Sequence, residues 1–136
     1  MYRRGILAAV VAAIVFASGS TCSAGPVLPG GPLQGDWSCT CTSLIRITVP
    51  PFTTTTFHIT QIGSVIQGVN APTGSDPLCA LAGTYSSGVI MANTTCGAPR
   101  NTTGYLVGTL AADGLSFDTL WLDSQGLYRI RGTKLP

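Results

Sequence analysis

Apolar and polar residues alternate along most of the chain, and this pattern predicts β-strands rather than helices. The first alternation starts at Gly35-Asp36-Trp37 and stops at Pro50-Pro51, because proline has no N–H to donate to a strand ladder. Seven further alternating segments follow, separated by stretches rich in Gly, Ser, Asp and Pro. The predicted strands span residues 36–49, 54–62, 65–70, 78–85, 89–95, 104–111, 115–122 and 127–134. On the first strand the expected inward residues are Trp37, Cys39, Cys41, Ile45, Ile47 and Val49.

Tight turns predict the register between strands, and therefore which side chains face inward. Two-residue hairpin loops are expected at Gly63-Ser64, Ser87-Gly88 and Asp113-Gly114, and a four-residue loop at 123–126. Counting outward from these turns gives the cross-strand partners. The expected inward pairs include Gln61 with Ile66, Phe57 with Asn70, Cys79 with Cys96, Leu106 with Trp121, Thr119 with Ile130, and Trp121 with Tyr128.

The order of the strands predicts an all-β fold. About eight strands follow one another through short hairpins, which describes an up-and-down antiparallel meander. Such a sheet tends to close on itself, because closure removes both exposed edges. We therefore predict a small barrel formed by one domain over residues 35–136, with a two-sheet β-sandwich as the alternative.

The first 24 residues have the pattern of an export signal. Arg3 and Arg4 precede an apolar run over residues 6–16, and small residues follow. That run is shorter than the roughly twenty residues of a membrane-spanning helix. Residues 25–34 then form an expected flexible lead-in, and the protein is predicted to be secreted or periplasmic. In the alternative, Cys22 carries a lipid anchor, although Gly19, Ser20 and Thr21 depart from the usual residues before a lipidated cysteine.

The cysteines agree with export. Loss or lipidation of Cys22 leaves Cys39, Cys41, Cys79 and Cys96, which predicts two disulfides in an oxidising compartment. A bridge between Cys39 and Cys41 would close a small, strained ring. We therefore expect each of these two to bond to one of Cys79 and Cys96, while a direct bond between Cys79 and Cys96 stays open.

Charge argues against nucleic acid as a partner. Removing Arg3 and Arg4 with the signal leaves five of the seven basic residues, against five acidic residues, all of them aspartate. The remaining chain of about 110 residues, enough for one ordinary domain, is thus close to neutral. A surface that follows a phosphate backbone needs clustered Lys and Arg, and this chain has none.

Catalytic and metal-binding motifs are missing from the sequence. His58 is the single histidine, the register places it outward, and the chain has no glutamate to assist it. No serine lies in a Gly-x-Ser-x-Gly turn. We expect no enzyme activity, no metal and no cofactor.

Several short motifs resemble the calycin superfamily of lipocalin-like and avidin-like barrels. They are Gly35-x-Trp37 at the first strand, the hairpin over residues 59–68, and the arginine-bearing final strand over residues 128–133. The resemblance covers most of the chain after the signal. It implies that Trp37 plugs the closed end of the barrel, with Arg129 or Arg131 packed over it. Biotin binding is not expected, because the further tryptophan of the avidin strands has no counterpart here.

The inner face combines polar and aromatic residues, as a small-molecule site does. The candidate ligand-binding residues are Gln61, Asn70, Thr119, Trp121 and Tyr128. The first hypothesis is therefore a barrel that carries a small apolar or amphipathic ligand; the same residues in a filled core are the structural alternative. The second is a secreted interaction module, such as a protease inhibitor or an envelope-associated protein, acting through loops 71–77 or 96–101.

Overall fold

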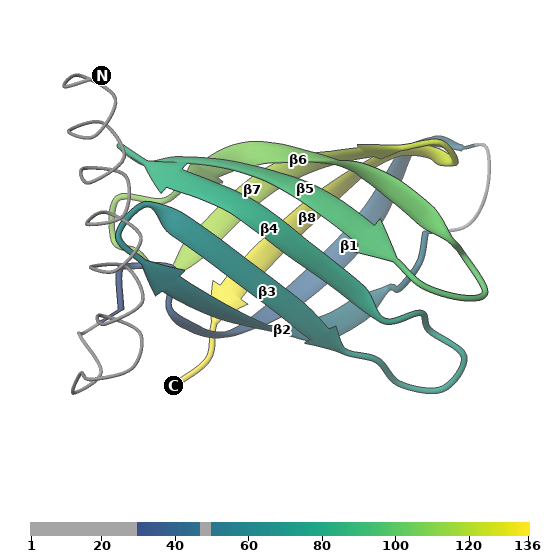
Figure 1. Cartoon of the computed structure of the whole chain (residues 1–136), viewed down its shortest axis with the longest axis horizontal. Coiled ribbons are helices and arrows are strands. Elements are labelled where there is room, and N and C mark those ends of the chain that lie inside the picture. Colours follow the sequence, from purple (N-terminus) through teal and green to yellow (C-terminus); the bar gives the residue numbers. More distant parts are fainter. Residues whose placement is uncertain (1–29, 47–49) are drawn as a thin grey trace, which may run out of the picture.

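The computed structural model describes residues 30–46 and 50–136, which form a closed barrel of eight antiparallel strands in sequence order (Figure 1). The predicted signal segment and Cys22 lie outside the described residues. No helix in the described part of the chain is long and apolar enough to cross a membrane. The strands are β1 (Gly35–Arg46), β2 (Thr54–Ile62), β3 (Val65–Ala71), β4 (Cys79–Ser86), β5 (Val89–Cys96), β6 (Thr102–Leu110), β7 (Ser116–Asp123) and β8 (Gly126–Lys134).

The predicted meander barrel is confirmed, and its predicted registers are the observed ones. Gly63, Gly88 and Gly114 have φ values of 60°, 81° and 73°, which glycine adopts without strain. The first two lie in the predicted two-residue turns, whereas Gly114 lies in a longer connection in which Ala111 N–H donates to Ser116 O. The inward pairs predicted from the turns all occur in the ladders. Closure comes from β1, which pairs with β2 on one side and with β8 on the other.

β1 departs from the predicted alternation in its second half. Trp37, Cys39 and Cys41 are buried as expected. A register shift between Ser43 and Ile45 then inserts an extra residue, and Ile45 is 60% exposed rather than inward. An extra residue in a strand moves the side chain that follows it to the opposite face, so the parity of Trp37 does not hold at Ile45. Ile47 and Val49, which are also predicted to face inward, lie outside the described residues.

The barrel has two different ends. β1 begins and β8 stops at one of them, which we call the closed end; it lies on the left in Figure 1, near the carboxyl terminus. The loops over residues 50–53, 72–78 and 97–101 and the turn at 124–125 lie at the other, which we call the mouth end. Apolar side chains from all eight strands fill the space between the two ends.

The closed end is sealed by the segment that precedes β1. Leu33 is fully buried; its N–H donates to Gln61 Oε1 at 2.9 Å, and its carbonyl accepts from Trp37 Nε1 at 2.9 Å. The Trp37 ring packs on Phe117, with ring centroids 5.0 Å apart. A Cβ at Gly132 would collide with Phe117, so glycine makes room for this ring. Leu33, which lies within the predicted lead-in, is therefore part of the packed closed end.

The basic residue over Trp37 is Lys134, not Arg129 or Arg131. Lys134 pairs with Trp37 across the β1–β8 ladder, and its Nζ lies 5.5 Å from the centroid of the indole. Arg129 instead forms an ion pair with Asp118, and Arg131 Nε lies 3.8 Å from the same carboxylate. The side chains of both arginines point to the outer face, because Arg129 and Arg131 alternate along β8 with the buried residues Tyr128 and Ile130.

The disulfide pattern also differs from the prediction. Cys79 bonds to Cys96, which is the alternative pairing, and Cys39 and Cys41 carry free, buried thiols. Cys79 and Cys96 face each other across adjacent strands, with a Cα–Cα distance of 4.1 Å. β1 lies across the barrel from β4 and β5, so the expected bridges would have to span the interior.

Candidate functional site

The five predicted site residues are all buried, but they do not form one site. Gln61 belongs to the closed end: beyond its bond with Leu33, its Nε2 donates to Gly63 O at 2.8 Å. Asn70 holds the β3–β4 loop, because it accepts from Cys79 N at 2.7 Å and donates to Pro77 O at 3.2 Å. The amides of Gln61 and Asn70 thus hold neighbouring backbone in place. The predicted site residues that remain are Thr119, Trp121 and Tyr128.

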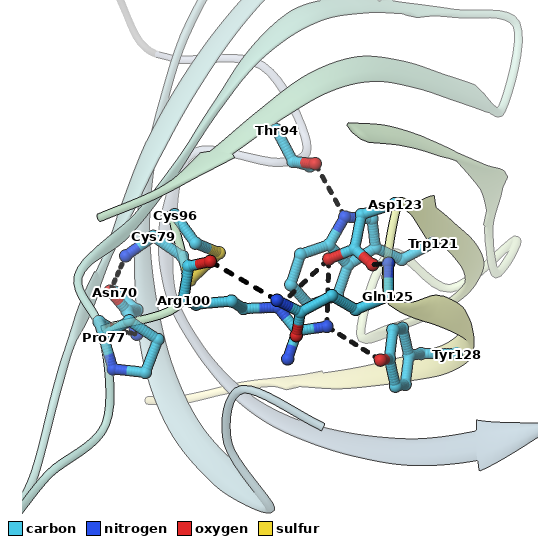
Figure 2. Close-up of a disulfide and its surroundings, with 10 residues drawn as sticks. All are labelled: Asn70, Pro77, Cys79, Thr94, Cys96, Arg100, Trp121, Asp123, Gln125 and Tyr128. Atoms are coloured by element: carbon cyan, nitrogen blue, oxygen red, sulfur yellow. Dashed lines mark hydrogen bonds and ion pairs between the residues drawn. A yellow bond between two sulfur atoms is a disulfide. The ribbon is translucent and has the colours of Figure 1, made fainter. Parts of the chain in front are cut away.

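Trp121 is the centre of what remains. Its Nε1 donates to Thr94 Oγ1 at 2.6 Å, and its ring lies 5.5 Å from the ring of Tyr128 (Figure 2). Thr119, which lies two residues before Trp121 on β7, donates to Ile130 O at 3.0 Å. The bond to Thr94 fixes the orientation of the indole, so Trp121 presents a defined aromatic surface to the interior.

A buried ion pair lies beside Trp121 at the mouth end, as Figure 2 shows. Arg100 donates from Nε and Nη2 to Asp123 Oδ2, at 3.1 and 2.9 Å, and from Nη2 to Tyr128 Oη at 2.8 Å. The two charged side chains are only 6% and 0% exposed. The guanidinium carbon also lies 5.5 Å from the Trp121 ring centroid and 5.1 Å from that of Tyr128.

The ion pair was not predicted from the sequence. Arg100 lies in a loop, where alternation gives no information on the direction of a side chain, and Asp123 is the first residue of the predicted four-residue loop at 123–126. That turn exists, since Asp123 Oδ1 accepts from the N–H groups of Gln125 and Gly126 at 2.8 and 3.1 Å. The same carboxylate thus shapes the β7–β8 turn and neutralises Arg100, which places both on the mouth end.

A small cavity of about 30 Å³ lies in the barrel interior. This is room for a single water molecule, and an apolar wall leaves such a space dry. The interior is therefore mostly a filled core. The cavity is lined by Leu33 from the closed end, by Phe52 from the mouth end, and by strand residues that include Cys39, Phe57, Thr94, Thr119 and Trp121.

A larger, open pocket of about 330 Å³ lies outside the same mouth. Three loops and the β7–β8 turn contribute to it. Pro51 in its wall directly precedes Phe52 in the wall of the cavity, and Arg100 links the pocket to Trp121. The pocket residues are Pro50, Pro51, Ser75, Asp76, Pro77, Pro99, Arg100 and Gln125.

The free thiols of Cys39 and Cys41 are protonated and poor nucleophiles at neutral pH. Burial raises the pKa of each from 9.0 to about 12, so both are protonated at neutral pH. Among the described residues, no group of three or more His, Cys, Asp or Glu side chains is arranged to hold a metal ion. His58 lies outward as predicted, with its Nδ1 2.6 Å from Asp36 Oδ1 on the exposed face.

Comparisons with known proteins describe the fold and leave the family open. Neither a protein-family model nor a curated protein matches the chain. Among solved structures, it is similar to mFAP1, a redesigned β-barrel bound to DFHBI: the TM-score is 0.59 at 16% identity, over 76% of this chain and 95% of that one. Another redesigned β-barrel gives a TM-score of 0.58 at 14% identity, over 77% and 93%. Membership of a lipocalin or avidin family stays a prediction.

Proposed function

We propose that this protein is an exported, non-enzymatic barrel that binds a small apolar or amphipathic molecule at its mouth end. The observation that carries the proposal is the adjacency of two spaces at that end. The apolar cavity reaches inward along Trp121, and the pocket of about 330 Å³ opens outward past Arg100. A binding site needs an apolar wall with a few fixed polar groups, and this end provides both.

Polar groups for orienting a ligand are concentrated near this end. Besides the Arg100–Asp123–Tyr128 network, two buried hydroxyls among the described residues, those of Ser43 and Thr102, have no hydrogen-bond partner within the protein. Ser43 pairs with Tyr128, and Thr102 with Cys96, so both lie in the mouth half of the barrel. The Cys79–Cys96 disulfide in the same half is compatible with an oxidising compartment.

The similarity to mFAP1 supports a binding role. That structure is a redesigned β-barrel solved with bound DFHBI, and this chain is likewise a β-barrel. At 16% identity the likeness concerns the fold, so the ligand of mFAP1 is not assigned to this chain. Eight strands give a barrel interior that holds either its own side chains or one small ligand.

Tryptophan fluorescence tests the proposal. In a Trp37→Phe variant, Trp121 is the only tryptophan of the folded barrel, so its emission reports on the cavity. Titration with fatty alcohols, fatty acids and neutral aromatic dyes should give a saturable change for at least one compound. The matched control, Trp121→Phe in the wild-type background, should show no such change. A flat response to the whole panel would exclude the proposal.

A protein-binding role is the second candidate, supported by an exposed apolar band on the outer face. Met91, Val107 and Leu120 are neighbours across β5, β6 and β7, and are 55%, 47% and 43% exposed. Tyr105 and Leu122 form the adjacent row at 67% and 57%. Exposed apolar patches of this kind mark interaction surfaces. A Val107→Lys variant should lose capture of an extracellular partner and keep the fluorescence response, if both roles exist.

A further inference from the structure

The mouth end of the cavity is closed by an aromatic side chain that does not belong to any strand. In the described part of the chain, Leu33 and Phe52 are the two members of the hydrophobic core cluster that come from outside the eight strands. Phe52 follows Pro50-Pro51 and is 2% exposed, while the next residue, Thr53, is exposed. The carbonyl of Thr53 accepts from Cys41 N at 2.9 Å, which fixes the chain where it turns back into β2.

The contacts of the Phe52 ring are those of a bound aromatic molecule. It stacks on Trp121, with centroids 6.2 Å apart and planes inclined by 20°, and meets Phe57 edge to face at 5.9 Å. Trp121 itself is held by its bond to Thr94, so the receiving surface is already in place without Phe52. Offset stacking on such a surface stabilises aromatic pairs by about 0.5–1.5 kcal/mol beyond the area that they bury.

We propose that Phe52 occupies the ligand position, and that the natural ligand is an uncharged, planar aromatic molecule that displaces this ring and stacks on Trp121. The inference rests on the proposed function and names its ligand class. With Phe52 in place, about 30 Å³ of the cavity is free, which is too little for an aromatic ring to enter beside Trp121. Vacating the ring would enlarge the same apolar space toward the benzene-sized range of about 150 Å³.

The charge at the mouth favours a neutral ligand. Arg100 is already neutralised by Asp123, and both side chains are almost completely removed from solvent. A charged group on the part of the ligand that stacks on Trp121 would therefore lose its hydration and meet only charges that are already paired. Asp76, the other charged residue of the mouth, lies in the outer pocket. The polar part of an amphipathic ligand instead lies outward, in the pocket lined by Pro51 and Pro77.

The experiment uses N-phenyl-1-naphthylamine, a neutral aromatic dye whose emission rises in apolar surroundings, with 1-dodecanol as an aliphatic competitor. We expect Phe52→Ala to bind the dye at least tenfold more tightly than the wild type, because the protein no longer has to displace its own ring. Phe52→Leu, which keeps an apolar side chain without the ring, should fall between the two. Val69→Ala, which removes an exposed side chain on the outer face of β3, is the control and should leave the dye affinity within twofold of the wild type.

The outcomes separate this inference from the proposed function. Equal dye affinity for the wild type and a folded Phe52→Ala or Phe52→Leu variant would overturn the displacement of Phe52. Binding of 1-dodecanol alone, with no binding of the dye, would overturn the aromatic class and leave the proposed function standing. If neither compound binds to any of the variants, both proposals fall. Far-ultraviolet circular dichroism establishes that each variant is folded.

Discussion

The two ends of the barrel are closed by similar means but fastened differently. At the closed end, Leu33 is held through its own backbone, by hydrogen bonds to Gln61 on one side and Trp37 on the other. At the mouth end, Phe52 is held by stacking on Trp121 and by the edge of Phe57. Ring contacts can be remade by another aromatic group, whereas a buried N–H or carbonyl needs its own partner. The same barrel thus has a permanent end and an exchangeable one.

Electrostatics separates the two ends further. The mouth contains a nearly inaccessible ion pair between Arg100 and Asp123, while the cation at the closed end, Lys134, lies over the Trp37 ring and donates to Pro32 O at 3.1 Å in an exposed position. Removing one partner of a buried ion pair strongly lowers the free energy of unfolding, because the other charge stays unpaired in the interior. The following four predictions test this comparison, starting with the largest expected effect.

Removal of the Trp37 ring should damage the permanent end most. Trp37→Ala loses a fully buried indole, its packing on Phe117 and its hydrogen bond to Leu33. We expect the free energy of unfolding to fall by about 4–5 kcal/mol, measured by urea denaturation. Dye affinity at the mouth, measured on the folded variant, should stay within twofold of the wild type. A loss of under about 2 kcal/mol would show that Trp37 is not the main support of this end.

Breaking the ion pair should destabilise the mouth end nearly as much. Arg100→Met leaves the carboxylate of Asp123 buried without its partner, and we expect a loss of about 3–4 kcal/mol. The double variant Arg100→Met/Asp123→Leu should recover part of that loss, which a double-mutant cycle measures. The matched surface control is Arg129→Met, where solvent already screens the ion pair with Asp118 and no measurable change is expected. Equal effects of the two single arginine variants would contradict the comparison.

An effect confined to alkaline pH should come from the two thiols. The pKa of Cys39 and of Cys41 is about 12 in the fold against an ordinary 9.0, so burial favours the protonated form. This contribution to stability is complete below pH 9 and is lost as the pH rises from 9 through 12. Unfolding free energies at pH 8, 9.5 and 11 should therefore decline more steeply in the wild type than in Cys39→Ala/Cys41→Ala. Parallel curves would mean that the thiols are ionised at their usual pH.

The smallest effect should come from the cation over Trp37. Lys134→Met keeps much of the aliphatic packing and removes the charge, and we expect a loss of under about 1 kcal/mol. Emission from Trp37 in a Trp121→Phe background should also change, because the charge no longer lies 5.5 Å from the indole. The same change in Arg131→Met, but not in Lys134→Met, would restore the sequence-based assignment of the plug.

The strand order and the inward faces could be predicted because glycine turns anchor the register. From Gly63, Gly88 and Gly114, strict alternation carries the assignment along each hairpin. The same arithmetic placed Cys79 opposite Cys96. It failed in β1 only beyond Ser43, where a bulge breaks the alternation. Local rules therefore describe this barrel wherever a tight turn and an uninterrupted strand follow each other.

The candidate site could be predicted only in part, because half of it comes from loops. Trp121 and Tyr128 were found from strand parity, but Phe52 and Arg100 lie where alternation does not apply. Strand parity predicts that Cys39 faces inward, but it does not predict which residue lies opposite Cys39 across the barrel. The disulfide partner of Cys39 was therefore predicted wrongly. The choice between Lys134 and Arg131 as the cover of Trp37 depended likewise on the β1–β8 register, and no tight turn joins these two strands.

The carboxyl terminus leaves the barrel beside the start of β1, where Leu135 N–H donates to Asp36 O at 2.9 Å (Figure 1). β8 alone has nine residues, so a group attached after Pro136 stands roughly 30 Å from the loop that carries Arg100. A surface, a bead or a fused carrier can thus be attached at the carboxyl terminus, on the end of the barrel opposite the mouth. All copies immobilised in this way would present the same accessible opening to solution, which is the orientation that a sensor or an affinity matrix requires.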